Sequence, residues 1–371
     1  MSETRHFSVG CLIPKLPLAD SPSAWLEQVR KAFDAIPSVH NLKLIGINDL
    51  NYRWAGGEIG QFGDEEIPVP EIGTTAFDIH IPARLQTNLG VPLGDEEVED
   101  FSVITFFNHV HPVTFVSCCD TEVDVRNPSA SMIIVREFLI TQLRKVQPEI
   151  ELFQIGPSPF HVDFSISPGQ GKTPIGGGFS YSKEKILGYD RVEYYYEPEG
   201  KATGGTTDSA LWRLYLATMQ EFSYFYHFES LRNARLRAMG KLSRDSRELA
   251  ERFKDKGIRA YLYRTFALRH QLQSARLETI SARLDAMRQK RSAKEDIDGL
   301  YSSAEGVGLK EYLERTTEEE YLDEIEASEK ILEMLEGRHS QEVQRFATIS
   351  FSLLGVVVGA ILTAAFRTWW G

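Results

Sequence analysis

The sequence predicts an α+β, or α/β, cytosolic domain with a mixed sheet, followed by a long helical stalk and one C-terminal transmembrane helix. Three observations predict this order. Strand-like and helix-like apolar patterns alternate over residues 1–200, an aromatic and arginine-rich helical sequence fills 206–316, and an uncharged apolar stretch occupies 346–366. We assign 317–345 to a stalk helix and 367–371 to a short external tail.

Composition favours a chain with two folded regions and an anchor. Its 371 residues, 42% hydrophobic and 25% charged, are enough for two units with their own cores. No apolar run follows a basic start, so we expect no cleaved secretory signal and a cytoplasmic N-terminal domain. Cys11, Cys118 and Cys119 form no disulfide framework, and we interpret them as reduced thiols. The expected location is the inner (plasma) membrane.

The elements of the first domain follow from the period of its apolar residues. Helical spacing predicts helices at Ser23–Ala35 and Ser129–Val146. A hairpin is expected to turn near His111 and Pro112. Strands are expected at Phe7–Ile13, Leu42–Ile47, Thr75–Ile81, Phe101–Phe107, Val113–Cys119, Glu151–Ile155, Phe160–Ile166 and Arg191–Tyr196.

After a glycine-rich linker the strands stop and helical sequence begins. Thr207–Met239 is dense in aromatic residues on nearly all sides, which predicts burial on several faces. Gly240 predicts the end of this helix, because glycine readily adopts the left-handed cap conformation. Helical sequence resumes at Ser243 and continues to about Arg291, with Gly257 as a candidate break.

This helical region is basic in an otherwise acidic chain. Between Arg232 and Lys294 there are 18 Lys and Arg against 6 Asp and Glu, whereas the whole chain has a formal net charge of −12. We expect these arginines to pair with the acidic sequence at 318–336 or to face anionic lipid. No nucleic-acid-binding motif accompanies the charge, so we do not expect a nucleic-acid partner.

The stalk and the membrane helix are predicted to be continuous. Thr317–Glu320 reads as a capping box, in which a hydroxyl and a carboxylate satisfy free amides at a helix start. A 4,3 spacing then runs from Tyr321 to Phe346 and predicts packing against other helices. Phe346–Phe366 has no charged residue and spans roughly 30 Å as a helix, enough to cross a bilayer once. The expected interface anchors are Arg345, Arg367, Trp369 and Trp370.

Small and hydroxylated residues recur on one face of the predicted membrane helix. Gly355 and Gly359 form a small-xxx-small pair, which lets two helices approach closely in lipid. This face predicts a homo-oligomer, either through simple helix packing or as the lining of a pore. Its members are Thr348, Ser352, Gly355, Gly359 and Thr363.

Two histidine motifs are candidates for a metal-binding or catalytic site. His109 and His111 would share one face of an extended strand, near Cys118 and Cys119, which makes them candidate metal ligands. Pro112 and the non-standard spacing favour structural roles. The second motif, at 160–163, places a histidine and an aspartate on one side of a strand without a nucleophile. We therefore predict no catalytic residue and no required cofactor.

The glycines at 169–173 superficially resemble a phosphate-binding loop. Ile166 stands where the first glycine of that motif belongs, and Pro174 prevents the helix whose N-terminus would hold the phosphate. The segment is therefore predicted to be a hairpin loop.

In its layout, the chain resembles the CorA family of magnesium transporters. The resemblance consists of an N-terminal α/β domain, a helical section, and a long charged helix, Thr317–Phe366, that runs into the membrane. It implies a homopentamer whose stalk helices continue as pore helices. The Gly-Met-Asn signature of the family does not follow Phe366, and no second span is present, so selective magnesium transport is not expected.

We carry three functional hypotheses from the sequence. The first is a homo-oligomeric membrane protein whose cytosolic domain senses a ligand, ion or partner and rearranges a transmembrane bundle, which could conduct ions or permeabilise the membrane. The second is a tail-anchored scaffold or receptor whose α/β domain binds a partner or small ligand. The third is a membrane-attached hydrolase that uses His109, His111 or His161.

Overall fold

The computed structural model divides the chain into two compact units. It describes residues 4–16, 20–54, 66–86, 98–119, 128–155, 162–186, 189–198, 206–254, 257, 263, 268–301, 309–318 and 322–370. The first unit comprises Met1–Ala234 and Ser292–Glu318, and the second comprises Arg235–Arg291 and Glu319–Gly371. Two of the three boundaries, after Ala234 and after Arg291, fall inside long helices, so each of these helices contributes to both units.

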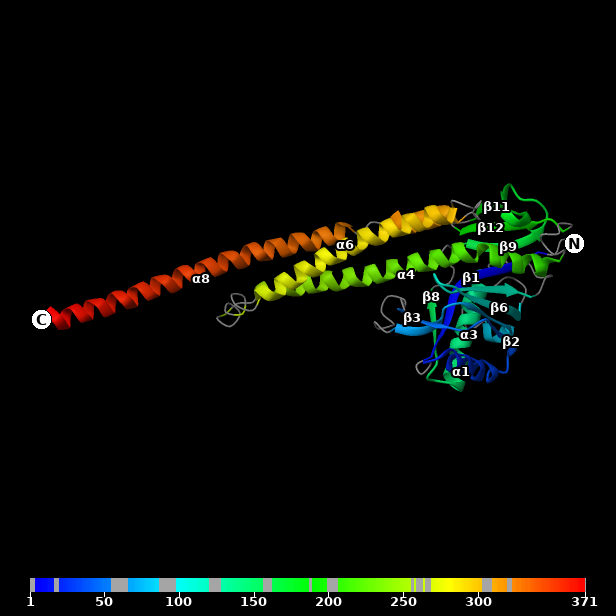
Figure 1. The fold of residues 1–371 in the computed structure, drawn as a ribbon, viewed down its shortest axis with the longest axis horizontal. Coiled ribbons are helices and arrows are strands. Elements are labelled where there is room, and N and C mark those ends of the chain that lie inside the picture. Colours follow the sequence, from blue (N-terminus) through cyan, green and yellow to red (C-terminus); the bar gives the residue numbers. More distant parts are fainter. Residues whose placement is uncertain are drawn as a thin grey trace. The chain divides into compact units, whose positions relative to one another are not determined.

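A ten-stranded mixed sheet forms the centre of the first unit and confirms the predicted α+β class (Figure 1). Its order is β10-β11-β12-β9-β1-β7-β6-β5-β2, and β8 pairs with the end of β1. β9 and β12 are parallel, whereas the other neighbours are antiparallel. The strands are β1 (Arg5–Lys15), β2 (Val39–Ile45), β5 (Gly73–His80), β6 (Asp100–Phe107), β7 (Val113–Cys118), β8 (Glu151–Ile155), β9 (Val162–Pro168), β10 (Thr173–Ile175), β11 (Phe179–Ile186) and β12 (Tyr189–Tyr196).

Seven helices and a separate two-stranded hairpin complete the described chain. The hairpin pairs β3 (Leu50–Trp54) with β4 (Glu66–Pro70). The helices are α1 (Pro22–Asp34), α2 (Ala83–Gln86), α3 (Ala130–Val146), α4 (Thr207–Lys254), α6 (Leu268–Tyr301), α7 (Lys310–Glu318) and α8 (Leu322–Trp370).

Alternation along β1 places helices on both faces of the sheet. The ring of Phe7 contacts Tyr215 of α4 at a centroid distance of 5.4 Å, and the next residue, Ser8, hydrogen-bonds Ser131 of α3 at 2.6 Å. Successive side chains of a strand point to opposite faces, so α4 and α3 cover different faces. On the α3 side the approach is close, because a Cβ at Gly10 would lie 2.7 Å from the Met132 side chain.

An aromatic cluster joins α4 to the sheet. Phe115 of β7 stacks on Tyr215 of α4 at 4.1 Å and meets Phe222 edge-on at 5.7 Å. Phe164 of β9 also meets Phe222 edge-on, at 5.4 Å. Offset-stacked and edge-to-face rings are the favoured geometries for aromatic pairs. The predicted burial of the aromatic helix on several sides is confirmed, since Tyr215 and Phe222 are buried on this face and Phe228, roughly 120–140° around α4, is buried as well.

Most predicted strands and both early helices are found close to their expected bounds. The β6–β7 hairpin turns at Asn108–Pro112, as predicted. Four strands were missed, namely β3, β4, β10 and β11. The predicted helix end at Gly240 is wrong, because α4 continues through it to Lys254. Met239 and Leu242 are buried beside Gly240, and this packing offsets the cost of a glycine in a helix, which is about 1 kcal/mol.

In the second unit, α4, α6 and α8 pack together along a shared line of buried apolar side chains, called the seam below. Apolar side chains from each helix form its buried cluster: Leu249 of α4, Leu268, Leu272 and Ala275 of α6, and Leu332 and Leu335 of α8. The predicted packing of the stalk against other helices is therefore confirmed. The predicted helix start at Thr317 is wrong: Thr317 lies in the last turn of α7, where its hydroxyl donates to Glu314 O at 2.7 Å. α8 begins at Leu322.

Candidate functional site

The apolar half of α8 is the most distinctive feature of the described chain. α8 has 49 residues, and its section up to Arg367 is long and apolar enough to cross a membrane. Its large apolar side chains from Ile349 to Phe366 are between 46% and 76% exposed, and they occur on every side of the helix. The same residue types are buried in the first unit, so this segment is apolar without a protein core around it.

The predicted small and hydroxylated residues lie along one face of α8, which is called the small-residue stripe below. Three hydroxyls donate to the carbonyl four residues earlier: Thr348 to Gln344 O at 2.9 Å, Ser352 to Thr348 O at 2.8 Å, and Thr363 to Gly359 O at 2.8 Å. Such internal bonds satisfy a hydroxyl proton without a second helix. Cβ atoms added at Gly355 and Gly359 would meet open space.

The small-residue stripe faces away from the seam of the second unit. The seam positions of α8 are Ile325, Ser328, Leu332, Leu335 and His339, all buried. At 3.6 residues per turn, the centre of the stripe at 348–363 lies roughly 160° around the helix from the centre of these seam positions. The first half of α8 therefore packs against α4 and α6 with one face, and the small residues of its second half lie on the opposite face.

The predicted interface anchors lie at the two ends of the apolar segment. Arg345 precedes it and is exposed, and Arg367 follows it and is exposed. Trp369 is 90% exposed. The side chain of Trp370, the last residue of α8, lies outside the described part of the chain. This order of charge, apolar residues and charge with tryptophan is typical of a helix whose ends lie at membrane interfaces.

Two ion pairs attach the basic helix α6 to the acidic first half of α8. Arg276 lies 2.8 Å from Glu336, and Arg283 lies 3.2 Å from Glu329. The expected pairing of arginines with the acidic stalk is confirmed at these positions. From Arg276 to Arg283 the residue number rises along α6, whereas it falls along α8 from Glu336 to Glu329, so the two helices are antiparallel.

The candidate metal ligands His109 and His111 separate in the structure. His109 is exposed, with Nδ1 3.0 Å from Glu71 Oε1. His111 is buried, and its Nδ1 lies 2.9 Å from Pro112 O and 3.8 Å from Cys11 Sγ. The chain bends at 109–110, so the condition for a shared strand face, an extended backbone, is not met. Among the described residues, no group of three or more His, Cys, Asp or Glu could hold one metal ion.

In the second histidine motif, the aspartate caps the start of a helix. His161 lies outside the described residues. Asp163 is buried, and its Oδ1 accepts a hydrogen bond from Ser129 N at 3.2 Å, at the start of α3. Burial raises the pKa of Asp163, although the bond from Ser129 and the charge of Arg191 oppose this shift. The carboxylate therefore satisfies a free helix amide.

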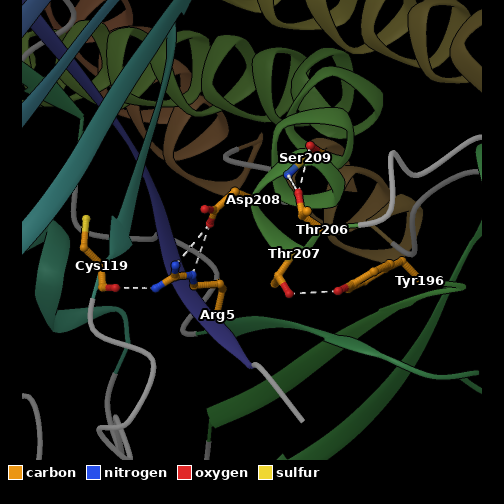
Figure 2. A network of polar contacts seen from close by, with 7 residues as sticks. All are labelled: Arg5, Cys119, Tyr196, Thr206, Thr207, Asp208 and Ser209. Atoms are coloured by element: carbon orange, nitrogen blue, oxygen red, sulfur yellow. Dashed lines mark hydrogen bonds and ion pairs between the residues drawn. The ribbon is translucent and has the colours of Figure 1, made fainter.

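A polar network fixes the start of α4 and was missed in the sequence (Figure 2). Arg5 pairs with Asp208 at 3.2 Å and donates to the backbone oxygen of Cys119. Ser209 N donates to Thr206 Oγ1 at 3.3 Å, which caps the helix, and the hydroxyls of Thr207 and Tyr196 are 2.8 Å apart. Because 203 residues separate Arg5 from Asp208, no local pattern could reveal this contact.

A second cluster attaches α7 to the edge of the sheet. The Tyr312 hydroxyl donates to Asp190 Oδ2, and Lys183 Nζ lies 3.3 Å from the same oxygen. Lys183 Nζ also lies 4.4 Å from the centre of the Tyr312 ring, a cation–π contact. Burial opposes ionisation of Asp190, but the bonds from Tyr312 and Lys183 outweigh it and lower its pKa. This cluster has a structural explanation, since it joins β11, β12 and α7.

The glycine segment after β9 is a loop and not a phosphate-binding loop, but the predicted hairpin is wrong, because this loop leads to β10, which pairs with β11 and not with β9. Thr173 begins β10, and a short 3-10 turn, Gly176–Gly178, follows it rather than a phosphate-binding helix. Gly171 is required here, because a Cβ would lie 2.8 Å from the Tyr181 backbone. Its amide already donates to Ser180 Oγ at 2.6 Å, and the amide of Lys172 donates to Ser182 Oγ at 3.2 Å. These bonds occupy two donors that a phosphate would need.

The fold and this arrangement define an α+β unit joined to a helical seam whose last helix can cross a membrane. Comparison with known protein families, with curated proteins and with solved structures found no match.

Proposed function

We propose that the chain is a homo-oligomeric single-pass membrane protein, anchored by the apolar half of α8 and carrying the first unit and the three-helix seam on the cytoplasmic side. The observation that supports this most directly is the exposure of the apolar segment between Arg345 and Arg367 on every side. Removing one such side chain from water is favourable by about 1.5–3 kcal/mol, and a bilayer provides that environment along a full ~30 Å of helix.

Two features support the cytoplasmic orientation. Lys330, Arg338 and Arg345 lie on the side of the apolar segment that joins the helical seam, against Arg367 on the other side, and basic residues favour the cytoplasmic side. All three cysteines are free thiols, which fits a reducing compartment.

In this proposal the small-residue stripe is the contact between copies in the membrane. Gly355 and Gly359 have no Cβ to hold a second helix away, and the neighbouring hydroxyl protons are satisfied within α8. The function is then to transmit the state of the cytoplasmic unit to a helix bundle. Since the hydroxyl protons are used internally, packing is supported more directly than a hydrated pore.

Alkaline carbonate extraction of membranes tests the anchor. The full chain is expected to stay in the membrane pellet. A double variant, Val357→Arg with Ile361→Arg, places two charges on the face opposite the stripe, at about 2.5–3.5 kcal/mol each, and is expected to be extracted. The matched control Ile45→Arg changes an exposed residue of β2 and is expected to stay in the pellet. Extraction of the unmodified chain would refute the anchor.

Ion conduction is a second candidate function, supported by the single-sided hydroxyl stripe. Purified protein in liposomes would be measured for ion flux, with Gly355→Leu and Gly359→Leu as the comparison. Flux that is absent, or unchanged in these variants, excludes a pore lined by the stripe. The scaffold alternative predicts that activity survives replacement of the span by an unrelated polyleucine helix.

A further inference from the structure

The seam of the second unit ends close to the apolar segment of α8. The two α6–α8 ion pairs advance by seven residues along each helix, in opposite directions. A further step of seven residues brings position 269, at the start of α6, level with about position 343 of α8. Burial agrees, because Phe346 is half-buried whereas residues 351–367 are exposed throughout. This end of the seam therefore lies within about two helical turns, roughly 10 Å, of the apolar segment.

Exposed basic residues gather at this end of the seam, which is called the basic end below. The described residues 251–254, 268–274 and 338–345 include five basic residues against two acidic ones. Further from the apolar segment, residues 322–337 of α8 include six acidic residues and one basic residue. The charge of α8 therefore changes from negative to positive toward its apolar segment. The five residues of the basic end, all exposed, are Arg252, Lys254, Arg269, Arg338 and Arg345.

The charges of the basic end are not neutralised within the described part of the chain. Arg276 and Arg283, further along α6, are paired with glutamates of α8. Arg252 instead donates from Nη1 to two neutral acceptors, the Tyr263 hydroxyl at 3.1 Å and Gln271 Oε1 at 3.3 Å. These bonds hold the guanidinium between α4 and α6 while its charge stays available to an anion outside the chain.

We propose that the basic end binds the phosphate groups of anionic phospholipids in the bilayer that α8 crosses. This inference rests on the proposed anchoring, which brings the basic end to the level of the lipid headgroups. A separation of roughly 10 Å is close to the screening length in physiological salt, about 8 Å, so the attraction persists. Guanidinium groups also bind phosphate through two parallel hydrogen bonds. The contact holds the end of the seam against the membrane surface.

Electron paramagnetic resonance of spin-labelled lipids tests this contact in the full chain. The chain is reconstituted in phosphatidylcholine vesicles with a trace of spin-labelled phosphatidylglycerol or spin-labelled phosphatidylcholine, and the immobilised fraction of each label is measured. The unmodified chain is expected to prefer phosphatidylglycerol by roughly fivefold or more, since each basic residue near an anionic surface contributes about that factor. A triple variant, Lys254→Gln with Arg269→Gln and Arg338→Gln, is expected to lose this preference.

The matched control removes the same charge from exposed residues of the same unit. Lys241→Gln, Arg244→Gln and Arg288→Gln lie between about 15 and 30 Å further from the apolar segment along α4 and α6. This control is expected to keep the preference for phosphatidylglycerol. Absence of the preference in the unmodified chain, or an equal loss in both triple variants, would overturn the proposal.

Two further measurements separate the lipid contact from a phosphate-ion site and from the anchor. Sodium phosphate and sodium chloride at equal ionic strength are expected to weaken the preference equally. A loss in phosphate alone would identify free phosphate as the ligand and overturn the proposal. Both triple variants are expected to resist carbonate extraction, because the apolar segment is unchanged. A chain that resists extraction but shows no lipid preference refutes the basic end as a lipid site while the anchor stands.

Discussion

Phenylalanine occurs in opposite surroundings in the first unit and in the second half of α8. Phe115 is fully buried among the rings of Phe7, Tyr215 and Phe222, whereas Phe351 is 76% exposed. The first unit buries its apolar surface with its own residues. The apolar segment of α8 has the same residue types but leaves them exposed, so hydrophobicity alone does not show whether a segment has a protein core around it.

The largest expected difference is in the unfolding free energy, when the same Phe→Ala substitution is made separately in each of the two regions. Phe115→Ala is expected to lower the unfolding free energy of the first unit by about 3–5 kcal/mol, because it opens a cavity between β7 and α4. Phe351→Ala should change it by less than ~0.5 kcal/mol, since that ring packs on no core. Chemical denaturation followed by near-ultraviolet circular dichroism measures both. Equal losses would contradict the comparison.

A smaller effect is expected where the first unit depends on a polar attachment. Asp190→Ala removes the acceptor of Tyr312 and the partner of Lys183, and should cost about 1–3 kcal/mol. Hydrogen exchange is expected to accelerate in α7 (Lys310–Glu318) and to stay slow in α3. Glu311→Ala is the control, because Glu311 also pairs with Lys183 but is largely exposed. A similar loss in the control would point to general charge effects.

The same attachment predicts a dependence on alkaline pH. Burial, together with the bond to Asp190, raises the pKa of Tyr312 to about 12 from its ordinary value near 10. A raised pKa means that folding favours the neutral phenol, so this contribution is fully present below pH 10 and is lost as the pH rises to about 12. Unfolding free energies measured from pH 9 to 12 should fall, and Tyr312→Phe should fall less steeply. Parallel slopes would exclude Tyr312 as the cause.

The smallest expected effect concerns the ion pairs of the second unit. A double-mutant cycle on Arg283→Ala and Glu329→Ala should give a coupling free energy of about 0.2–1 kcal/mol, because both side chains are partly exposed. The coupling should weaken at high salt. A coupling several times larger would mean that the seam depends on charge rather than on Leu332 and Leu335.

The sequence predicted the elements that have a clear period. The strands at β1, β6 and β7, the helix α3 and the exposed span were all visible as runs or spacings of apolar residues. The strand β10 was missed because it has only three residues, two of them exposed. The Thr317 cap failed because a threonine hydroxyl bonds equally well to a carbonyl within a helix.

The site was predicted less completely than the fold. The small-residue stripe and Arg345 could be identified because they lie on one continuous helix. The separation of His109 from His111 could not be predicted, since it depends on the turn that follows β6. Contacts such as Arg5 with Asp208 join segments far apart in sequence, and no spacing rule reports them.

α8 continues without interruption from the seam at Leu332 and Leu335 to the glycine pair at Gly355 and Gly359. Its 49 residues form a rod of about 74 Å. Any twist of that rod about its own axis at the seam turns the glycine face by the same angle. A one-residue shift of the packing at Leu332 would therefore rotate the glycine face by roughly 100°, which is enough to replace it with a face of valine and leucine side chains.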